Sequence, residues 1–182
     1  MEIKVPFYHV VNMFLTGLVL LGGGIMLFPD VATSFLGNSF ITRASVGPEI
    51  VGVICLAAIS YEVGLIVNRI GSVILEPILR KLKMIPFDND YVKYNRVKMR
   101  FQIMETLSRE YSLSRTGIAL FIILAIMALF SSTKLFAIPL AAIAVVYLVS
   151  CRKHAARIVA LMAMPMDKED SANAEKDAIH GS

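Results

Sequence analysis

The residues in this sequence most able to do chemistry are ionisable and hydrogen-bonding side chains inside apolar runs. Glu62 interrupts one such run, and an ionised carboxylate there has to face protein, water or a partner subunit rather than lipid. A structural hydrogen bond or ion pair, a pore lining and a proton relay all remain open for it. Glu49 precedes the same run, where a carboxylate suits the first turn of a helix or the mouth of an oligomeric passage.

His9, Asn12 and Thr16 recur at spacings of three and four residues, which places them on one face of a helix. Asn12 in such a position can hydrogen-bond across a helix interface. If this face instead lined an axis between copies of the chain, the same residues would wet a pore. The candidate pore or gate residues are therefore Asn12, Thr16, Glu49 and Glu62.

Basic residues form a second group between the apolar runs. Their ordinary explanation is a surface that packs beside lipid headgroups. The alternative is a docking surface for an anionic signal molecule or a cytoplasmic partner protein, and no nucleic-acid motif accompanies the charge. The candidate contact residues are Arg80, Lys81, Lys83, Lys93, Arg96, Lys98 and Arg100.

No enzyme, cofactor or metal signature is present. The sequence lacks Gly-x-Ser-x-Gly, Walker, Rossmann and His-Glu-x-x-His motifs, and its three histidines lie in separate regions. Asp88 and Asp90 fall short of a calcium loop, and Asp90 is expected to cap the following helix. We predict a protein that is not an enzyme and binds no metal or cofactor; an intramembrane enzyme ranks last among the alternatives.

Composition assigns these residues to a membrane protein. The chain has 182 residues, of which 57% are hydrophobic and 18% charged, and its mean hydropathy is +0.69. Soluble domains usually carry about a quarter charged residues, so this chain is too apolar for that class. Cys55 and Cys151 lie inside apolar runs, which predicts buried thiols rather than a disulfide framework.

Four apolar runs are long enough to cross a hydrocarbon core of about 30 Å as helices. They cover residues 7–28, 49–68, 116–133 and 135–151. The first lacks the basic start and cleavage site of a secretory signal, so we expect a retained helix. A short polar turn makes the last two runs an antiparallel hairpin. Glycines such as Gly17, Gly23, Gly52 and Gly64 favour close packing of the first two spans.

The stretch between the second and third spans is expected to be helical. One apolar stripe predicts that the second span continues, or bends at Pro77, into an amphipathic helix; it comprises Ile70, Ile74, Ile78, Leu82 and Ile85. A further helix is predicted over 91–115, with an apolar stripe of Phe101, Met104, Leu107 and Tyr111. Glu105 and Arg109 are spaced for a surface ion pair.

The distribution of Lys and Arg predicts the orientation in the membrane. Sixteen of the 18 Lys and Arg residues fall at the termini or within 69–115, and only Arg43 and Lys134 fall on the other side. Both termini and the central segment are therefore predicted to be cytoplasmic. The expected fold is all-α and polytopic, with a transmembrane helix pair (1–70), a basic helical cytoplasmic segment (71–115), a transmembrane hairpin (116–151) and a cytoplasmic tail (152–182) that is mostly disordered after 165.

Two stretches carry a family resemblance: Tyr61-Glu62-Val63-Gly64 with Asn68-Arg69-Ile70-Gly71-Ser72 and Glu76-Pro77, and Leu107-Ser108-Arg109-Glu110-Tyr111-Ser112-Leu113-Ser114-Arg115. They resemble small bacterial inner-membrane proteins with two helical hairpins, some of which serve antiphage defence systems as membrane effectors or sensors. The resemblance covers roughly residues 61–130. It implies an effector that oligomerises and perturbs the bacterial inner membrane on receiving a cytoplasmic signal.

The sequence thus favours an oligomeric, channel-like membrane effector gated by a cytoplasmic signal. Its expected partners are the lipid bilayer, further copies of the chain, and a cytoplasmic protein or anionic signal molecule. The alternative is a non-conducting membrane anchor or sensor that recruits a cytoplasmic partner protein.

Overall fold

The computed structural model describes residues 7–37, 46–86, 90–101 and 103–164, and all regular structure within these ranges is helical. Four helical stretches are long and apolar enough to cross a membrane: Phe7–Leu27, Ile50–Lys81, Ile103–Phe130 and Lys134–Ala163. The predicted all-α fold with four candidate spans is therefore confirmed. The tail predicted to be disordered after 165 lies outside the described residues.

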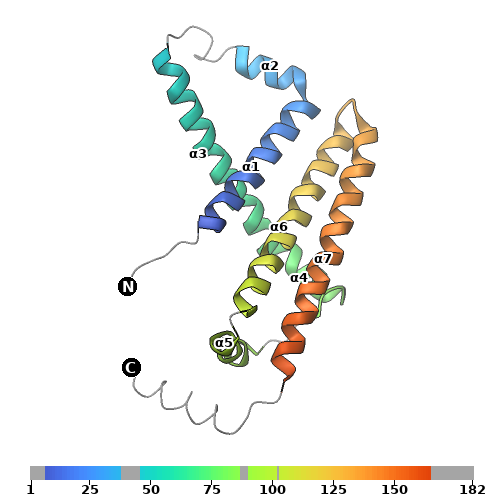
Figure 1. Cartoon of the computed structure of the whole chain (residues 1–182). Coiled ribbons are helices and arrows are strands. Elements are labelled where there is room, and N and C mark those ends of the chain that lie inside the picture. The colour runs from blue at the N-terminus through green and yellow to red at the C-terminus, as the bar shows by residue number, and fades with distance from the viewer. Residues whose placement is uncertain (1–6, 38–45, 87–89, 102, 165–182) are drawn as a thin grey trace.

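The first two long helices, α1 (Phe7–Leu27) and α3 (Val46–Ile70), cross each other near the middle of α1 (Figure 1). A Cβ atom on Gly17 would lie 1.6 Å from the backbone oxygen of Ser60, and one on Gly64 would lie 1.8 Å from that of Met13. Only glycine permits such an approach of two backbones. The expected close packing is confirmed at these two glycines, whereas Gly52 has no neighbouring atom within 4 Å. Beyond α1, a short helix α2 (Pro29–Gly37) follows.

The second span continues without a break into the basic segment, as predicted. A five-residue π-helix, η2 (Gly71–Leu75), joins α3 to α4 (Glu76–Lys81). Proline has no N–H to donate and its ring crowds the carbonyl four residues earlier, so the wider turn just before Pro77 has an evident cause. The predicted apolar stripe packs only at its two ends: Ile85 is buried and Ile70 packs against the core. Its middle residues Ile74, Ile78 and Leu82 are exposed, and between them Glu76 and Leu79 are buried instead.

The sequence predicts one continuous helix over 91–115, and this prediction is wrong. The structure has α5 (Tyr91–Arg100) and α6 (Ile103–Phe130), separated at Phe101, whose backbone is extended (φ −116°, ψ 105°). Asp90 caps α5 as predicted, because its Oδ1 accepts from the backbone N–H of Lys93 at 2.9 Å. Met104 and Leu107 of the predicted stripe are buried. The Glu105–Arg109 ion pair is present on the surface.

The last two spans form the predicted antiparallel hairpin. α6 is followed by a turn, a 3-10 helix η3 (Lys134–Phe136) and α7 (Ala137–Ala163). The Oγ of Ser131 in this turn donates to the backbone oxygen of Leu27 at 2.7 Å. This bond connects the hairpin to the end of α1.

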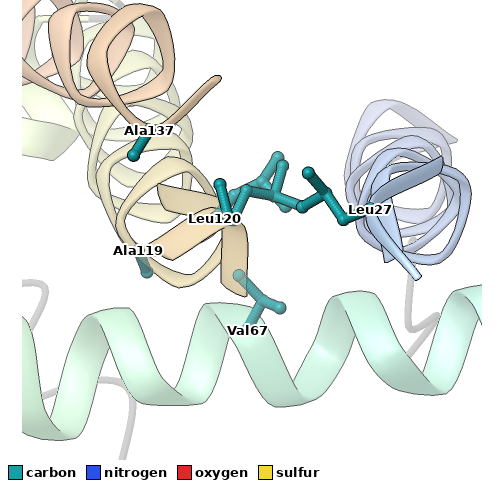
Figure 2. Packing of buried hydrophobic residues seen from close by; sticks show 7 residues of the cluster. Leu27, Val67, Ala119, Leu120 and Ala137 are labelled. Atoms are coloured by element: carbon teal, nitrogen blue, oxygen red, sulfur yellow. The ribbon is translucent and has the colours of Figure 1, made fainter. Parts of the chain in front are cut away.

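α6 lies centrally and holds the two helix pairs together. Leu27 of α1, Val67 of α3 and Ala137 of α7 belong to one buried cluster that runs along α6 (Figure 2). Its α6 members are Ala119, Leu120, Leu124 and Ala128. The outer faces of the four helices are largely exposed and apolar, as expected for surfaces that meet lipid. One thiol prediction fails there: Cys151 is buried, but Cys55 is exposed on α3.

Different segments of the chain meet at the two ends of the molecule. The start of α1, α4, α5, the start of α6 and the end of α7 gather at one end, which we call the basic end (Figure 1). The turn between α6 and α7, together with the end of α1, forms the other. The described segments that were predicted to be cytoplasmic therefore lie at the same end of the molecule, and their orientation in the membrane stays a prediction.

Candidate functional site

A three-residue charge cluster joins the two helix pairs at the basic end. Glu76, in the first turn of α4, accepts a hydrogen bond at Oε1 from Arg80 and at Oε2 from Arg115 of α6. The side chains of Glu76 and Arg115 are only 11% and 14% exposed, and that of Arg80 is 29% exposed. One carboxylate thus contacts two guanidinium groups, one from its own helix and one from α6.

A cavity of about 310 Å³ lies beside this cluster, between α6, α7 and the start of α5. From α6 it is lined by Ser108, Tyr111, Ser112 and Arg115, and from α7 by residues that include Ile158, Val159 and Met162. The guanidinium carbon of Arg115 lies 5.8 Å from the centroid of the Tyr111 ring. The cavity therefore has one polar wall and one apolar wall.

Two side chains of that wall each have one polar atom that is buried away from the cavity and has no hydrogen-bond partner within the described part of the chain. These atoms are the hydroxyl of Tyr111 and the Nε of Arg115. A buried donor left unpaired costs free energy, so these two atoms lower the stability of this part of the fold. His154 lies nearby on α7. Its Nδ1 is 3.0 Å from Glu110 Oε2, which is close enough for an ion pair, but the two groups are not aligned for a hydrogen bond.

A second cavity, of about 260 Å³, lies between the start of α1 and the outer side of α6. Tyr8, His9 and Asn12 line it from α1, and Arg109 lines it from α6. The predicted polar face of the first span is therefore only partly preserved. Asn12 borders this cavity, whereas Thr16 is buried beside the contact of α1 with α3.

The structure does not bring Glu62 together with Asn12 or Thr16. Ser60 and Gly64 are buried on the face of α3 that meets α1, and Glu62 lies between them in sequence, on the opposite, exposed face. Of the three environments that the sequence leaves open for Glu62, the described part of a single chain thus does not provide a protein interior. Glu49 lies in the first turn of α3, but its side chain is outside the described residues. A pore or gate role stays a prediction for all four candidates.

The predicted anion or partner contacts divide into two groups. Arg80 belongs to the charge cluster, and Lys93 is half-buried beside the cap of α5. The side chain of Arg96 lies outside the described residues. The remaining four are exposed at the basic end: Lys81, Lys83, Lys98 and Arg100.

Sequence reasoning missed Glu76, Tyr111 and Arg115 as site residues. The Glu76–Arg80 spacing of four residues is a visible signal for a helical ion pair. No local signal links Glu76 to Arg115, because 39 residues separate them.

Hydrogen bonds between spans involve short polar side chains. The Oγ1 of Thr116 donates to Oδ1 of Asn68 at 2.9 Å, and the hydroxyls of Ser114 and Ser150 lie 3.2 Å apart. Such bonds hold apolar helices together in lipid.

Within the ranges that the structure describes, no group of three or more His, Cys, Asp or Glu side chains is placed to hold a metal ion. Comparison with protein-family models, curated proteins and solved structures gave no match.

Proposed function

We propose that this protein is an oligomeric, channel-like membrane effector whose copies meet across the exposed face of α3. The observation that carries the proposal is the position of Glu62. This carboxylate lies within a candidate membrane span, on a face that no other part of the described chain covers. Facing lipid would cost several kcal/mol, so a second copy or a water-filled passage is the favoured environment.

Neighbouring residues support an interface on this face. Cys55, Ile59, Ile66 and Arg69 are also exposed, and with Glu62 they recur at alternating spacings of three and four residues. That spacing forms one continuous stripe along α3, which suits packing against the same helix of another copy. We call these five residues the α3 stripe. In a ring of copies, Glu62 would place carboxylates around an axis and favour cations there.

A cytoplasmic signal acting on the basic end would reach the α3 stripe through the chain itself. Arg115 of α6 contacts Glu76, and Glu76 follows η2 and α3 without a break. A change in that contact would shift the end of α3. The antiphage setting of the proposal rests on the resemblance of residues 61–130 to defence effectors.

Cation flux in liposomes tests conduction. We expect the wild-type protein to release trapped cations faster than protein-free vesicles, and Glu62→Gln to reduce the rate about tenfold because the axial charge is lost. Asn12→Leu tests the second candidate position. Glu105→Gln is the matched control, since Glu105 is a surface carboxylate paired with Arg109. A wild-type rate equal to that of empty vesicles would contradict conduction, and equal rates for Glu62→Gln and Glu105→Gln would contradict a position of Glu62 on the conduction path.

The exposed lysines at the basic end favour a second candidate, a non-conducting anchor that recruits an acidic cytoplasmic partner. Lys81, Lys83, Lys98 and Arg100 offer such a partner a positive surface. This candidate predicts a stable complex and no flux. Charge reversal at Lys81, Lys83, Arg96 and Arg100 should abolish co-purification of the partner, and a complex that survives reversal would exclude this surface.

A further inference from the structure

The second candidate span is longer than a membrane requires. Ile50–Lys81 holds 32 residues, which at 1.5 Å per residue make a helix about 48 Å long. A hydrocarbon core is about 30 Å thick, so such a helix has to tilt or to leave the core before its end. The α3 stripe ends at Arg69, and η2 and α4 form the part of the helix that follows it.

η2 and α4 run across the α6–α7 hairpin rather than along it. At the start of η2, a Cβ atom on Gly71 would lie 3.4 Å from the backbone oxygen of Arg115 in α6. Two turns later, Leu79 belongs to one buried cluster with Ile118 of α6 and Cys151 of α7. The segment thus passes from α6 to α7 while its neighbours on α6 change only from residue 115 to residue 118 (Figure 1). It therefore crosses the hairpin at nearly one level.

At this level the exposed face of the hairpin changes from apolar to basic. On α7, Val146 and Val149 are exposed before Cys151, and Arg152 and Lys153 are exposed after it. In membrane proteins, basic side chains that follow an apolar lipid-facing surface mark the headgroup region. Because Leu79 packs in the same cluster as Cys151, α4 lies at the level where this change occurs.

The outer face of η2 and α4 is apolar and ends in two cations. Glu76 and Leu79 are buried toward the hairpin. On the other side, exposed residues occur in neighbouring pairs that repeat every four positions, which defines one helix face. The pairs are Val73 with Ile74, Pro77 with Ile78, and Lys81 with Leu82, and Lys83 is exposed just beyond them.

An apolar face that ends in cations matches the chemistry of an anionic leaflet, because acyl chains cover the apolar part and phosphates attract the cations. An acidic soluble protein would satisfy only the cations. A second copy of the same face would bring Lys81 and Lys83 beside like charges. We propose that this face binds an anionic phospholipid of the leaflet at the basic end. Lys81 and Lys83 donate to the headgroup phosphate, and the acyl chains pack against Ile74 and Ile78.

Tryptophan quenching by brominated lipids tests the site, because the chain has no tryptophan of its own. Ile78→Trp places one reporter on the face. In vesicles of equal parts phosphatidylcholine and phosphatidylglycerol, the bromine is carried on the acyl chains of one lipid or of the other. We expect phosphatidylglycerol to associate about fivefold more strongly than phosphatidylcholine, the effect of roughly one cation near an anionic headgroup. Ile74→Trp, one turn earlier on the same face, repeats the measurement, so the result does not depend on one substitution.

Val53→Trp is the matched control for the reporter. Val53 is exposed on α3, and no Lys or Arg occurs between residues 44 and 68, so both lipids should quench it equally. Equal quenching by the two lipids at positions 74 and 78 would overturn the proposal. Quenching by neither lipid would also overturn it, because water, a second copy or a partner protein would then cover the face.

Removing the two cations tests their role. Lys81→Gln combined with Lys83→Gln, in the Ile78→Trp chain, should abolish the preference for phosphatidylglycerol while total quenching stays, because the apolar face is unchanged. Lys98→Gln removes an exposed lysine of α5 and should keep the preference. A preference that survives the double substitution, or that Lys98→Gln removes as well, would overturn the assignment. Neither measurement depends on ion flux, so the lipid site and conduction can fail separately.

Discussion

At the scale of single residues, two glycines determine how the first helix pair packs. Gly17 and Gly64 allow the backbones of α1 and α3 to touch, with room for no side chain at either position. In lipid, where helices gain little from burying apolar surface, such close backbone contact is a main source of association. The sequence indicated that glycines would pack, but it could not show which of them meet another backbone.

Gly17→Ala and Gly64→Ala should each lower stability by about 3 kcal/mol, because the added methyl would overlap a backbone oxygen that cannot move alone. Gly22→Ala and Gly52→Ala are the controls; nothing lies within 4 Å of either position, and both should be neutral or slightly stabilising. Thermal unfolding in detergent can be followed by a thiol-reactive dye on buried Cys151 in a Cys55→Ser background. Equal effects at all four glycines would contradict the crossing.

Lys83 has a left-handed backbone conformation, which costs a glycine less free energy than a lysine. Its φ is 55°, and the N–H groups of Lys83 and Met84 bond back to the oxygens of Arg80 and Leu79, which closes the end of α4. Lys83→Gly should therefore raise stability by about 1 kcal/mol. Lys81→Gly, inside α4, should lower it by a similar amount. Destabilisation by Lys83→Gly would show that its side chain contributes more than its backbone costs.

At the scale of elements, the charge cluster connects α4 to α6. Glu76→Gln would remove the carboxylate that contacts both Arg80 and the largely buried Arg115, and we expect a loss of about 3 kcal/mol, as for other broken buried pairs. Glu105→Gln breaks the exposed pair with Arg109 and should cost about 0.3 kcal/mol. Thermal unfolding of the two variants side by side measures the difference. Similar small losses would mean that the cluster does not hold the two helix pairs together.

The length of the apolar runs was enough to predict the four spans, the short polar turn predicted the α6–α7 hairpin, and residue type predicted the cap at Asp90. It was not enough to find the break at Phe101, because no glycine or proline occurs there. The break accompanies a tertiary contact: Val97, Met104 and Met162 form one buried cluster, against which Phe101 packs. Long-range packing of this kind leaves no local signal.

The candidate site was even less predictable. Spacing identified a basic group between the spans, yet the arginine beside the cavity is Arg115, which the sequence presents only as the basic end of a helix. Glu62 was recognised by its isolation within an apolar run. Its exposure on the outer face of α3 became visible only once α1 was seen to cover Ser60 and Gly64.

At the scale of the whole molecule, the topology makes a direct prediction. In a Cys55→Ser background, Lys134→Cys should react with a membrane-impermeant maleimide added to intact cells, because the α6–α7 turn is predicted to lie outside. Lys98→Cys, on exposed α5, should react only after permeabilisation. The opposite pattern of labelling would invert the orientation and remove the proposed cytoplasmic site.

The α3 stripe leaves one native reporter of assembly. Cys55 lies two turns before Glu62 on the same exposed face, whereas Val53 is exposed on the opposite face of α3. Two Cys55 thiols from neighbouring copies would come close only if this face is the interface.

Oxidative cross-linking of the protein in native membranes with copper phenanthroline is therefore the most direct test that copies meet across the α3 stripe. The wild-type chain should form a disulfide-linked dimer that Cys55→Ser abolishes. A cysteine at position 53, introduced by Val53→Cys in the Cys55→Ser background, should form little or none. A wild-type chain that remains monomeric, or cross-linking as efficient through position 53 as through Cys55, would contradict the interface and the passage built on it.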